Sequence, residues 1–502
     1  MNSFLNNLKN NTNYKLTENG AVAHKTTNSA VYDMFAMGGA YRNRSKEDCI
    51  LLFKNAYEED KLLAIKCLFY LRDVRGGQGE RRFFRICFNW LCQEHPEDAR
   101  KLYALIPEYG RYDDLWDATN NTEVFRNAIA LIEDQLALDL DSQTPSLLAK
   151  WLPSENASSE DTKKIAKLIA KKLDLSNKEY RKDLTLLRER IRVVENLMSH
   201  NRWDEIEFDK LPSKAGILYK NAFARRDILA QKYENFIKNE KTTVNAKTLY
   251  PYEIISKITN NLGGYSIRMS EIDRLAVQKY WENQPNYITS DDNSIMCVVD
   301  TSGSMTGRDA SAPINIAIGL GMYAAERLNG PFKDHYISFS RTPKLIKIEG
   351  IDFADKVKRI YDTNLCENTD LHAVFNLLKA TALADFESIK DMPKTIVVIS
   401  DMEIDQGTGS SWYARENGWT TETAATEMEG IRKEWAAAGL TLPRLVYWNV
   451  DARQNTILDA GPNVSFVSGC SPIIFEQICK GVTGYQLMLD KLNSERYSKI
   501  TL

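Results

Sequence analysis

Residues 294–307 read SIMCVVDTSGSMTG, and in this stretch an unbroken apolar run passes directly into small oxygen-bearing side chains. Five consecutive apolar residues, Ile295–Val299, are typical of a strand that is buried on both faces of a sheet. Asp300, Ser302 and Ser304 follow at alternate positions, with a glycine between the serines that permits a tight turn. The stretch therefore predicts a buried strand whose carboxyl end carries a carboxylate and two hydroxyl groups.

The rest of the chain from about residue 288 also contains short runs of residues that are typical of strands. Short β-branched runs alternate with helical patterns, and six runs read as strands: SIMCVVD, DHYISFS, KLIKIEG, TIVVISD, PRLVYWNV and VSFVSG. Helices are expected at about 313–328, 370–383 and 472–492, and over TAATEMEGIRKEWAAAG. This alternation predicts an α/β, doubly wound parallel sheet with helices on both faces, so we assign residues 288–502 to one domain.

The residues before this domain have the periodicity of amphipathic helices. Between Ser45 and about His95 the apolar residues recur at helical spacing, and RGGQGERR at residues 75–82 separates two such helices. Further amphipathic segments follow, and no strand-like alternation precedes about residue 290. We therefore expect residues 1–287 to form an α-helical solenoid of HEAT-like repeats. No fixed-period repeat is visible, and closure into a ring is left open.

Composition bounds the class of protein. Of 502 residues, 43% are hydrophobic and 26% charged, with a formal net charge of -3, which is ordinary for a globular protein of two or three domains. This balance gives no global reason to expect nucleic acid or an anionic membrane, so any basic surface must be local. The sequence has neither a transmembrane-length apolar run nor the hydrophobic core of a signal peptide. We expect a cytoplasmic monomer with no membrane contact.

Two of the predicted strands end on an aspartate, Asp300 and Asp401, at the sheet edge where doubly wound folds bind ligands. Between them, Thr369 lies in NTDL at the start of a helix. Mg²⁺ takes six oxygens, keeps several waters and needs one or two carboxylates. Asp300, Ser302, Ser304, Thr369 and Asp401 therefore predict a site for Mg²⁺ or Mn²⁺. We expect Asp300 to be a surface carboxylate and Asp401 to act through water. The alternative is that the serines cap a helix.

The motifs DTSGSM, ENTDL and VVISDMEID resemble the metal-ion-dependent adhesion site, or MIDAS, of von Willebrand factor A domains. Matched residue by residue, Asp300, Ser302 and Ser304 correspond to the D-x-S-x-S motif of that family, Thr369 to its coordinating threonine, and Asp401 to its later aspartate. The resemblance implies a bound metal with one position open to an anionic oxygen of a partner.

A helical-repeat domain followed by such a domain is similar to the Ro autoantigen, or TROVE, family. The stretches YLRDVRGGQGERRFF, PEYGRYDDLWD, LPSKA and TLYPYEII resemble those of a bacterial and phage family with that arrangement. Ro proteins bind small noncoding RNAs and the single-stranded ends of misfolded RNAs. The resemblance therefore implies a ribonucleoprotein, with RNA as the partner and a bacterial or phage origin.

Local basic clusters are the expected footprint of a phosphate backbone. One cluster spans residues 163–192 and a second follows near residue 220; the candidate RNA-binding residues are Lys171, Lys172, Lys182, Lys220, Arg225 and Arg226. A solvated helix face explains such clusters equally well. RGGQGERR either holds a phosphate through its glycine amides or forms a tight turn between helices, and the turn is favoured because the nucleotide-loop pattern is missing.

The sequence shows no G-x-S-x-G, H-E-x-x-H or separated Ser/His/Asp pattern, so we expect a binding protein and not an enzyme. The chief rival to RNA binding is a scaffold that captures a partner protein's carboxylate at the metal.

Overall fold

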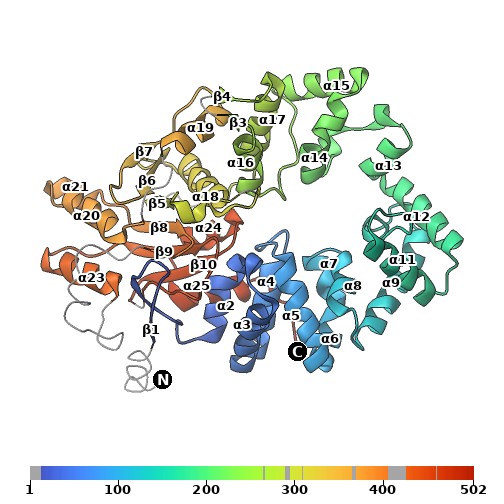
Figure 1. Ribbon diagram of the computed structural model, residues 1–502, viewed down its shortest axis with the longest axis horizontal. Helices are drawn as coiled ribbons and strands as arrows, with labels where there is room; N and C mark the ends of the chain where they lie inside the picture. The colour runs from blue at the N-terminus through green and yellow to red at the C-terminus, as the bar shows by residue number, and fades with distance from the viewer. Residues whose placement is uncertain are drawn as a thin grey trace. The chain divides into compact units, whose positions relative to one another are not determined.

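The computed structural model describes residues 13–263, 266–288, 294–307, 309–363, 369–404, 426–459 and 461–502 (Figure 1). The chain divides into two compact units. Unit 1 comprises Met1–Cys67 and Leu249–Tyr497, and unit 2 comprises Leu68–Thr248 and Ser498–Leu502. The boundary that we placed between residues 287 and 288 lies inside unit 1, because both ends of the predicted helical domain group with the sheet.

Unit 1 contains a six-stranded sheet in the order β10-β9-β8-β5-β6-β7. The strands are β5 (Ile295–Asp300), β6 (His335–Phe339), β7 (Leu345–Lys347), β8 (Thr395–Ser400), β9 (Arg444–Asn449) and β10 (Val464–Ser468). All six match the predicted runs, and the doubly wound α/β sheet is confirmed. One expectation was wrong: β7 runs antiparallel to β6, because the two are joined by a short turn and parallel strands need a long crossover.

The candidate cation site lies at the carboxyl ends of β5 and β8, where the order of the strands along the sheet reverses. From β5 the chain adds β6 on one side, whereas β8 and β9 continue on the other side of β5. Every residue of β5 and β8 is buried, which explains why both strands read as apolar runs without alternation. The crevice beyond the carboxyl ends of such neighbouring strands is the usual ligand site of doubly wound sheets.

Helix α18 (Pro313–Arg327) is buried along nearly its whole length because it is covered on two sides. A Cβ added at Gly321 would stand 2.4 Å from Val299 Cγ2 in β5. A Cβ at Gly319 would stand 3.0 Å from the backbone nitrogen of Tyr252 in α16 (Pro251–Thr259). The two glycines thus let α18 approach both the sheet and α16, which is why residues near 250 belong to unit 1.

The last predicted helix, 472–492, is interrupted. The structure has a 3-10 turn and then α24 (Phe475–Cys479) and α25 (Gly484–Leu492). Gly481 and Gly484 both have positive φ, at 77° and 57°, which ends one helix and redirects the chain before the next.

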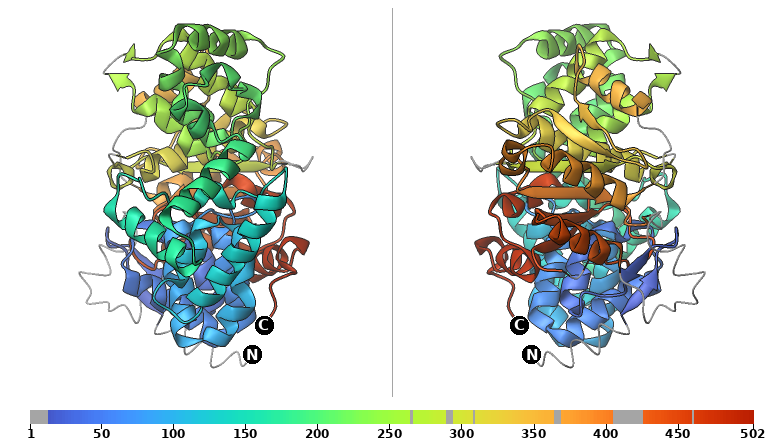
Figure 2. Two further views of the ribbon diagram at one scale, coloured as in Figure 1. Left: turned by 90° about the vertical axis from the view of Figure 1, so that its right-hand side faces the viewer. Right: turned by 90° about the vertical axis from the view of Figure 1, so that its left-hand side faces the viewer.

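The N-terminal residues complete the sheet domain and contain strands that the sequence did not predict. β1 (Tyr14–Leu16) and β2 (Val22–His24) form an antiparallel hairpin, and His24 exchanges backbone hydrogen bonds of 2.8 and 3.0 Å with Ile457. Helix α2 (Ala30–Met37) follows and packs on β10, as the blue and red segments of Figures 1 and 2 show. Strands of three residues are too short to give an alternating pattern of apolar and polar residues, so they could not be predicted from the sequence.

Over residues 68–248, all of which the structure describes, unit 2 contains helices joined by loops and no strand. Its longer helices are α5 (Arg81–Glu94), α9 (Phe125–Asp141), α11 (Glu160–Lys172), α12 (Asn177–Ile191), α14 (Ser213–Ala224) and α15 (Asp227–Lys238). The buried Arg72 pairs with the buried Asp114 at 2.6 Å. The helical texture is confirmed, and the repeat pattern of a solenoid stays a prediction. In the described part of the chain, no helix is both long and apolar enough to cross a membrane.

Candidate cation site at the sheet edge

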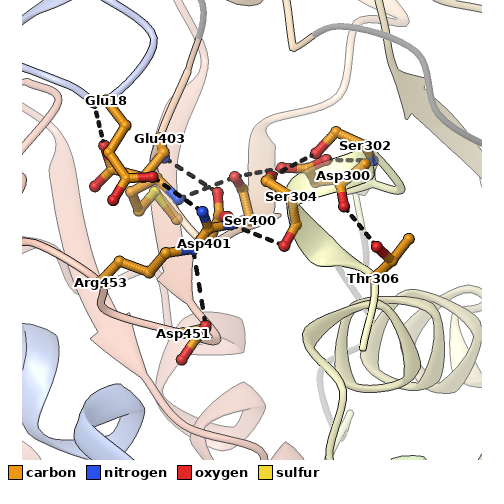
Figure 3. A network of polar contacts seen from close by, with 12 residues as sticks. Glu18, Asp300, Ser302, Ser304, Thr306, Ser400, Asp401, Glu403, Asp451 and Arg453 are labelled. Carbon is orange, nitrogen blue, oxygen red and sulfur yellow. Dashed lines mark hydrogen bonds and ion pairs between the residues drawn. The ribbon is translucent and has the colours of Figure 1, made fainter. Parts of the chain in front are cut away.

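The D-x-S-x-S loop brings its oxygen atoms together at the end of β5 (Figure 3). The backbone nitrogen of Ser302 donates to Asp300 Oδ1 at 2.9 Å, which turns the chain back on itself. The Oγ atoms of Ser302 and Ser304 lie 2.9 Å apart. Asp300 itself is 0% exposed, so our expectation of a surface carboxylate was wrong. The cause is that Asp300 is still the last residue of β5, which neighbours on both sides cover.

Asp401 follows β8 and is 1% exposed. Its Oδ1 accepts from the backbone nitrogen of Glu403 at 3.1 Å, and its Oδ2 accepts from Arg453 Nη2 at 2.6 Å. Met402, between the two acidic residues, has a φ of 65°, which is uncommon for a residue with a side chain and marks a sharp turn at the site. Both oxygens of Asp401 are thus already engaged by hydrogen-bond donors.

Ser400 is the last residue of β8, directly before Asp401, and its side chain contacts Asp300. Its Oγ donates to Asp300 Oδ2 at 2.6 Å and accepts from the backbone nitrogen of Met402 at 3.0 Å. We did not select Ser400 from the sequence, although the register of β5 and β8 provides the signal. Val299 pairs with Ile399 in that register, so the next residues of the two strands stand side by side.

The electrostatics of Asp300 are those of a carboxylate that lacks a counter-ion. Burial raises the pKa of Asp300 to about 7, the negative charge of Asp401 adds to the increase, and the hydrogen bonds from Ser400 and Ser302 offset only part of it. Among the described residues, the hydrogen bonds recorded to Asp300 come from neutral groups. A divalent cation at this position would supply the missing positive charge, so the residues present fit a hard metal ion.

Thr369 lies just before α20 (Leu371–Ala382) and is 2% exposed, while Asp370 caps that helix by accepting from the backbone nitrogen of Ala373 at 2.9 Å. Within the described residues no hydrogen bond is recorded between Thr369 and the other four candidate ligands, and residues 364–368 lie outside the described part. Hydrogen bonds thus join Asp300, Ser302, Ser304 and Asp401 in one network through Arg453, and among the described residues none of these hydrogen bonds involves Thr369.

Within the described residues, the hydrogen-bonded network at this sheet edge contains neither a histidine nor a cysteine side chain. In the part of the chain that the structure describes, no three His, Cys, Asp or Glu side chains gather as a metal-ligand group. A metal at this edge would therefore depend on hydroxyl oxygens besides Asp300, as Mg²⁺ and Mn²⁺ accept and softer metals do not favour.

The basic candidates in unit 2 fall into two groups. Lys171, Lys172 and Lys182 are exposed on α11 and α12, whereas Lys220 on α14 is half-buried. Arg225 and Arg226 are exposed just beyond α14, and the Arg226 guanidinium lies 4.8 Å from the ring centre of Trp203.

Other basic residues of the same region serve the fold. Arg188 donates to the carbonyl oxygens of Ala149 and Leu152 at 2.8 and 2.7 Å, and Arg190 donates to that of Leu140 at 2.7 Å. The RGGQGERR segment forms the tight turn that we favoured, since a Cβ at Gly77 would stand 1.8 Å from the carbonyl oxygen of Tyr70.

Comparison with known proteins gives two family matches. Residues 17–107 and 112–295, more than half of the chain, match a family described as a domain of unknown function, DUF2828. Residues 293–483 match a second, described as a domain of unknown function, DUF7788, and include β5 to β10. The two matches meet at residues 293–295, next to the start of β5.

The chain is similar to the uncharacterized protein L728 of Acanthamoeba polyphaga mimivirus, with 30% identity over 480 residues that cover 87% of this chain and 79% of that protein. Among solved structures, the crystal structure of the Deinococcus radiodurans Ro (RSR) protein aligns with a TM-score of 0.47 and 12% identity, over 91% of this chain and 100% of that chain.

Proposed function

The chain belongs to the DUF2828 family, and for this member we propose a divalent-cation-dependent binding protein without enzymatic activity. The observation that carries the proposal is the buried Asp300, which stands beside Asp401 and receives hydrogen bonds from neutral groups. Burying a carboxylate next to a second one costs stability unless a cation compensates. A bound Mg²⁺ or Mn²⁺ would compensate the negative charge of these two carboxylates.

The ligands that we propose are Asp300, Ser302, Ser304 and Thr369, with Asp401 acting through water. Asp401 fits that role because both of its oxygens already accept hydrogen bonds. When bound, the metal supplies an electrophile whose positive charge is only partly neutralised by protein ligands. Such a metal binds an anionic oxygen from a partner.

Burial also supports binding in preference to catalysis. Asp300, with its pKa near 7, has the proton affinity of a general base, and Ser400 donates to it as a nucleophile would. The Ser400 side chain is 0% exposed, however, so a substrate atom cannot reach it as a nucleophile, and a cation bound at Asp300 would occupy the carboxylate that a general base needs. The hydrogen bond between Ser400 and Asp300 is therefore better explained as part of a binding site than as a catalytic pair.

For the partner we propose RNA, small noncoding or single-stranded, in a Ro-like ribonucleoprotein. Supporting features lie in unit 2: the exposed lysines of α11 and α12, and the Arg226–Trp203 pair. Lysines neutralise phosphates, and an indole with a guanidinium above it is a surface on which bases stack. A carboxylate of a partner protein is the second candidate. The acidic neighbours of the cation site, Glu18, Glu403 and Asp451, repel any anion, but they repel the multiply charged backbone of RNA more strongly than a single carboxylate, which favours this second candidate.

The two partners are distinguished by binding measurements on the full chain. Labelled single-stranded RNA is titrated at 50 to 300 mM salt, in Mg²⁺ and in EDTA, and an acidic peptide is titrated in parallel. An RNA-binding protein loses affinity steeply as salt rises. Mg²⁺-dependent capture of the peptide with no RNA binding would establish the second candidate, and Mn²⁺ calorimetry showing no binding would refute the cation site.

A further inference from the structure

Arg453, in the loop after β9, reaches into the cation site from the side opposite the D-x-S-x-S loop (Figure 3). Its Nη2 donates to Asp401 Oδ2 at 2.6 Å and to the carbonyl oxygen of Ser304 at 2.8 Å. One nitrogen of the guanidinium therefore bridges the two halves of the site, which come from β5 and β8.

The guanidinium also contacts the N-terminal hairpin, through Glu18 in the turn between β1 and β2. Arg453 Nη1 donates to Glu18 Oε2 at 2.9 Å, and the backbone nitrogen of Glu18 donates to Glu403 Oε2 at 2.7 Å. The carbonyl oxygen of Arg453 also accepts a hydrogen bond from the Arg44 guanidinium. These contacts fix the position of a group that stays protonated at any physiological pH.

We infer that Arg453 sets the affinity of the site for divalent cations, because its fixed positive charge occupies Asp401 Oδ2 and keeps Asp401 from direct coordination. The inference rests on the proposed function, since it concerns the same site. A cation arriving at Asp300 is repelled by the guanidinium and gains less from Asp401 than it would if Arg453 were absent.

The direction of the effect follows from Coulomb's law. Two positive charges a few ångströms apart in a partly buried site repel by an amount that changes a dissociation constant at least tenfold. Removing the charge of Arg453 frees Asp401 Oδ2 and removes the repulsion. A residue that merely held the loop in place would have the opposite effect, because its loss would disorder the site and weaken metal binding.

The test is Mn²⁺ binding, measured by calorimetry and electron paramagnetic resonance on the full chain and its variants. Arg453→Gln should bind Mn²⁺ roughly tenfold more tightly than the unsubstituted chain. Arg453→Lys keeps the charge and should bind with nearly unchanged affinity. Arg432→Gln is the matched control, because Arg432 also pairs with a buried carboxylate, Asp459, outside the network of the cation site. It should leave the affinity unchanged.

A second variant changes the affinity in the other direction. Glu18→Gln removes the carboxylate that shares the guanidinium, so Arg453 pairs more strongly with Asp401 and Mn²⁺ affinity should fall about threefold. This variant decides the question if Arg453→Gln does not fold.

The outcomes separate the inference from the proposed function. If the unsubstituted chain binds Mn²⁺ and Arg453→Gln binds equally or less well, the inference is overturned and the cation site stands. If Arg453→Lys already binds as tightly as Arg453→Gln, charge is not the cause and the inference is again overturned. Absence of Mn²⁺ binding by both the unsubstituted chain and Arg453→Gln overturns the site and the inference together.

Discussion

Ser400 Oγ donates a 2.6 Å hydrogen bond to Asp300 Oδ2, and so links the carboxyl ends of two adjacent parallel strands, β8 and β5. Neither side chain is exposed to solvent. A hydroxyl stabilises a buried carboxylate less than a cation does, so Asp300 keeps a raised pKa. The metal-free protein therefore carries an electrostatic cost at this position, and the first prediction measures it.

Asp300→Asn should abolish Mn²⁺ binding and yet raise the melting temperature of the metal-free chain. The pKa of Asp300 is raised from 3.8 to about 7 in the folded state. Between these values the unfolded chain ionises first, so this group lowers stability by about 1.4 kcal/mol for each pH unit. The gain from the substitution should thus be larger at pH 8 than at pH 5, measured by thermal melts in EDTA.

Asp459→Asn is the control for this variant. Asp459 is also buried, but Arg432 compensates its charge, so the same substitution should lower the melting temperature. An Asp300→Asn chain that melts no higher than the unsubstituted protein at pH 8 would contradict the assignment of an uncompensated charge.

Reversing Lys171, Lys172 and Lys182 to Glu should weaken RNA binding across sequences. Each lysine that neutralises a phosphate contributes about one unit to the slope of log affinity against log salt, so the slope should flatten. Binding is measured by fluorescence anisotropy with labelled single-stranded RNA between 50 and 300 mM salt.

A triple reversal in unit 1 provides the matched control. Lys54, Lys347 and Lys390 are exposed and each pairs with a nearby glutamate, so reversing them makes the same change in net charge elsewhere. Equal losses in the two triple variants would show that net charge alone acts, and an unchanged slope in the first would show that its lysines are solvated.

Gly39→Ala should destabilise unit 1 by roughly 1–3 kcal/mol, because a Cβ there would stand 2.7 Å from the carbonyl oxygen of Ser468 in β10. The clash is with backbone, which cannot rotate away. Gly430→Ala is the control: it lies in helix α23 (Glu427–Ala437), no atom lies within 4 Å of the added Cβ, and alanine favours the helix by up to about 1 kcal/mol. Urea denaturation distinguishes them, and equal stabilities would show that the 3-10 helix Gly38–Asn43, which follows α2, does not pack on β10 as described.

His24 should make the protein sensitive to acid. Burial lowers the pKa of His24 although Glu429 and Asp459 act against it, and neither ring nitrogen has a hydrogen-bond partner among the described residues. Below the unfolded pKa of about 6.5, the unfolded chain takes up the proton before the folded protein does. The stability of the folded protein therefore decreases as the pH is lowered. Above that pKa the group has little effect.

His24→Phe should reduce this loss while keeping the stacked contact with Tyr14, whose ring centre lies 5.0 Å away. The measurement is the difference in melting temperature between the variant and the unsubstituted chain at pH 7.5 and 5.5. A difference that does not grow at pH 5.5 would show that His24 is protonated in the folded state.

The sequence by itself determined the sheet strands and the carboxyl-terminal ends that carry Asp300 and Asp401. Five apolar runs became β5, β6, β8, β9 and β10, because strands buried on both faces need consecutive apolar residues and this requirement is local, and KLIKIEG became the largely exposed edge strand β7. The D-x-S-x-S spacing also predicted the meeting of Ser302 and Ser304, since a turn over five residues leaves few other arrangements.

Only the tertiary structure decided what surrounds that site. Glu18 and Arg453 are separated by 435 positions and meet at one carboxylate network, and neither has a neighbour in sequence that marks it as part of the site. The same holds for the burial of Asp300 and for the packing of α2 on β10. Contacts between distant segments depend on how whole elements pack, and amphipathic periodicity records that a face is buried but not which partner buries it.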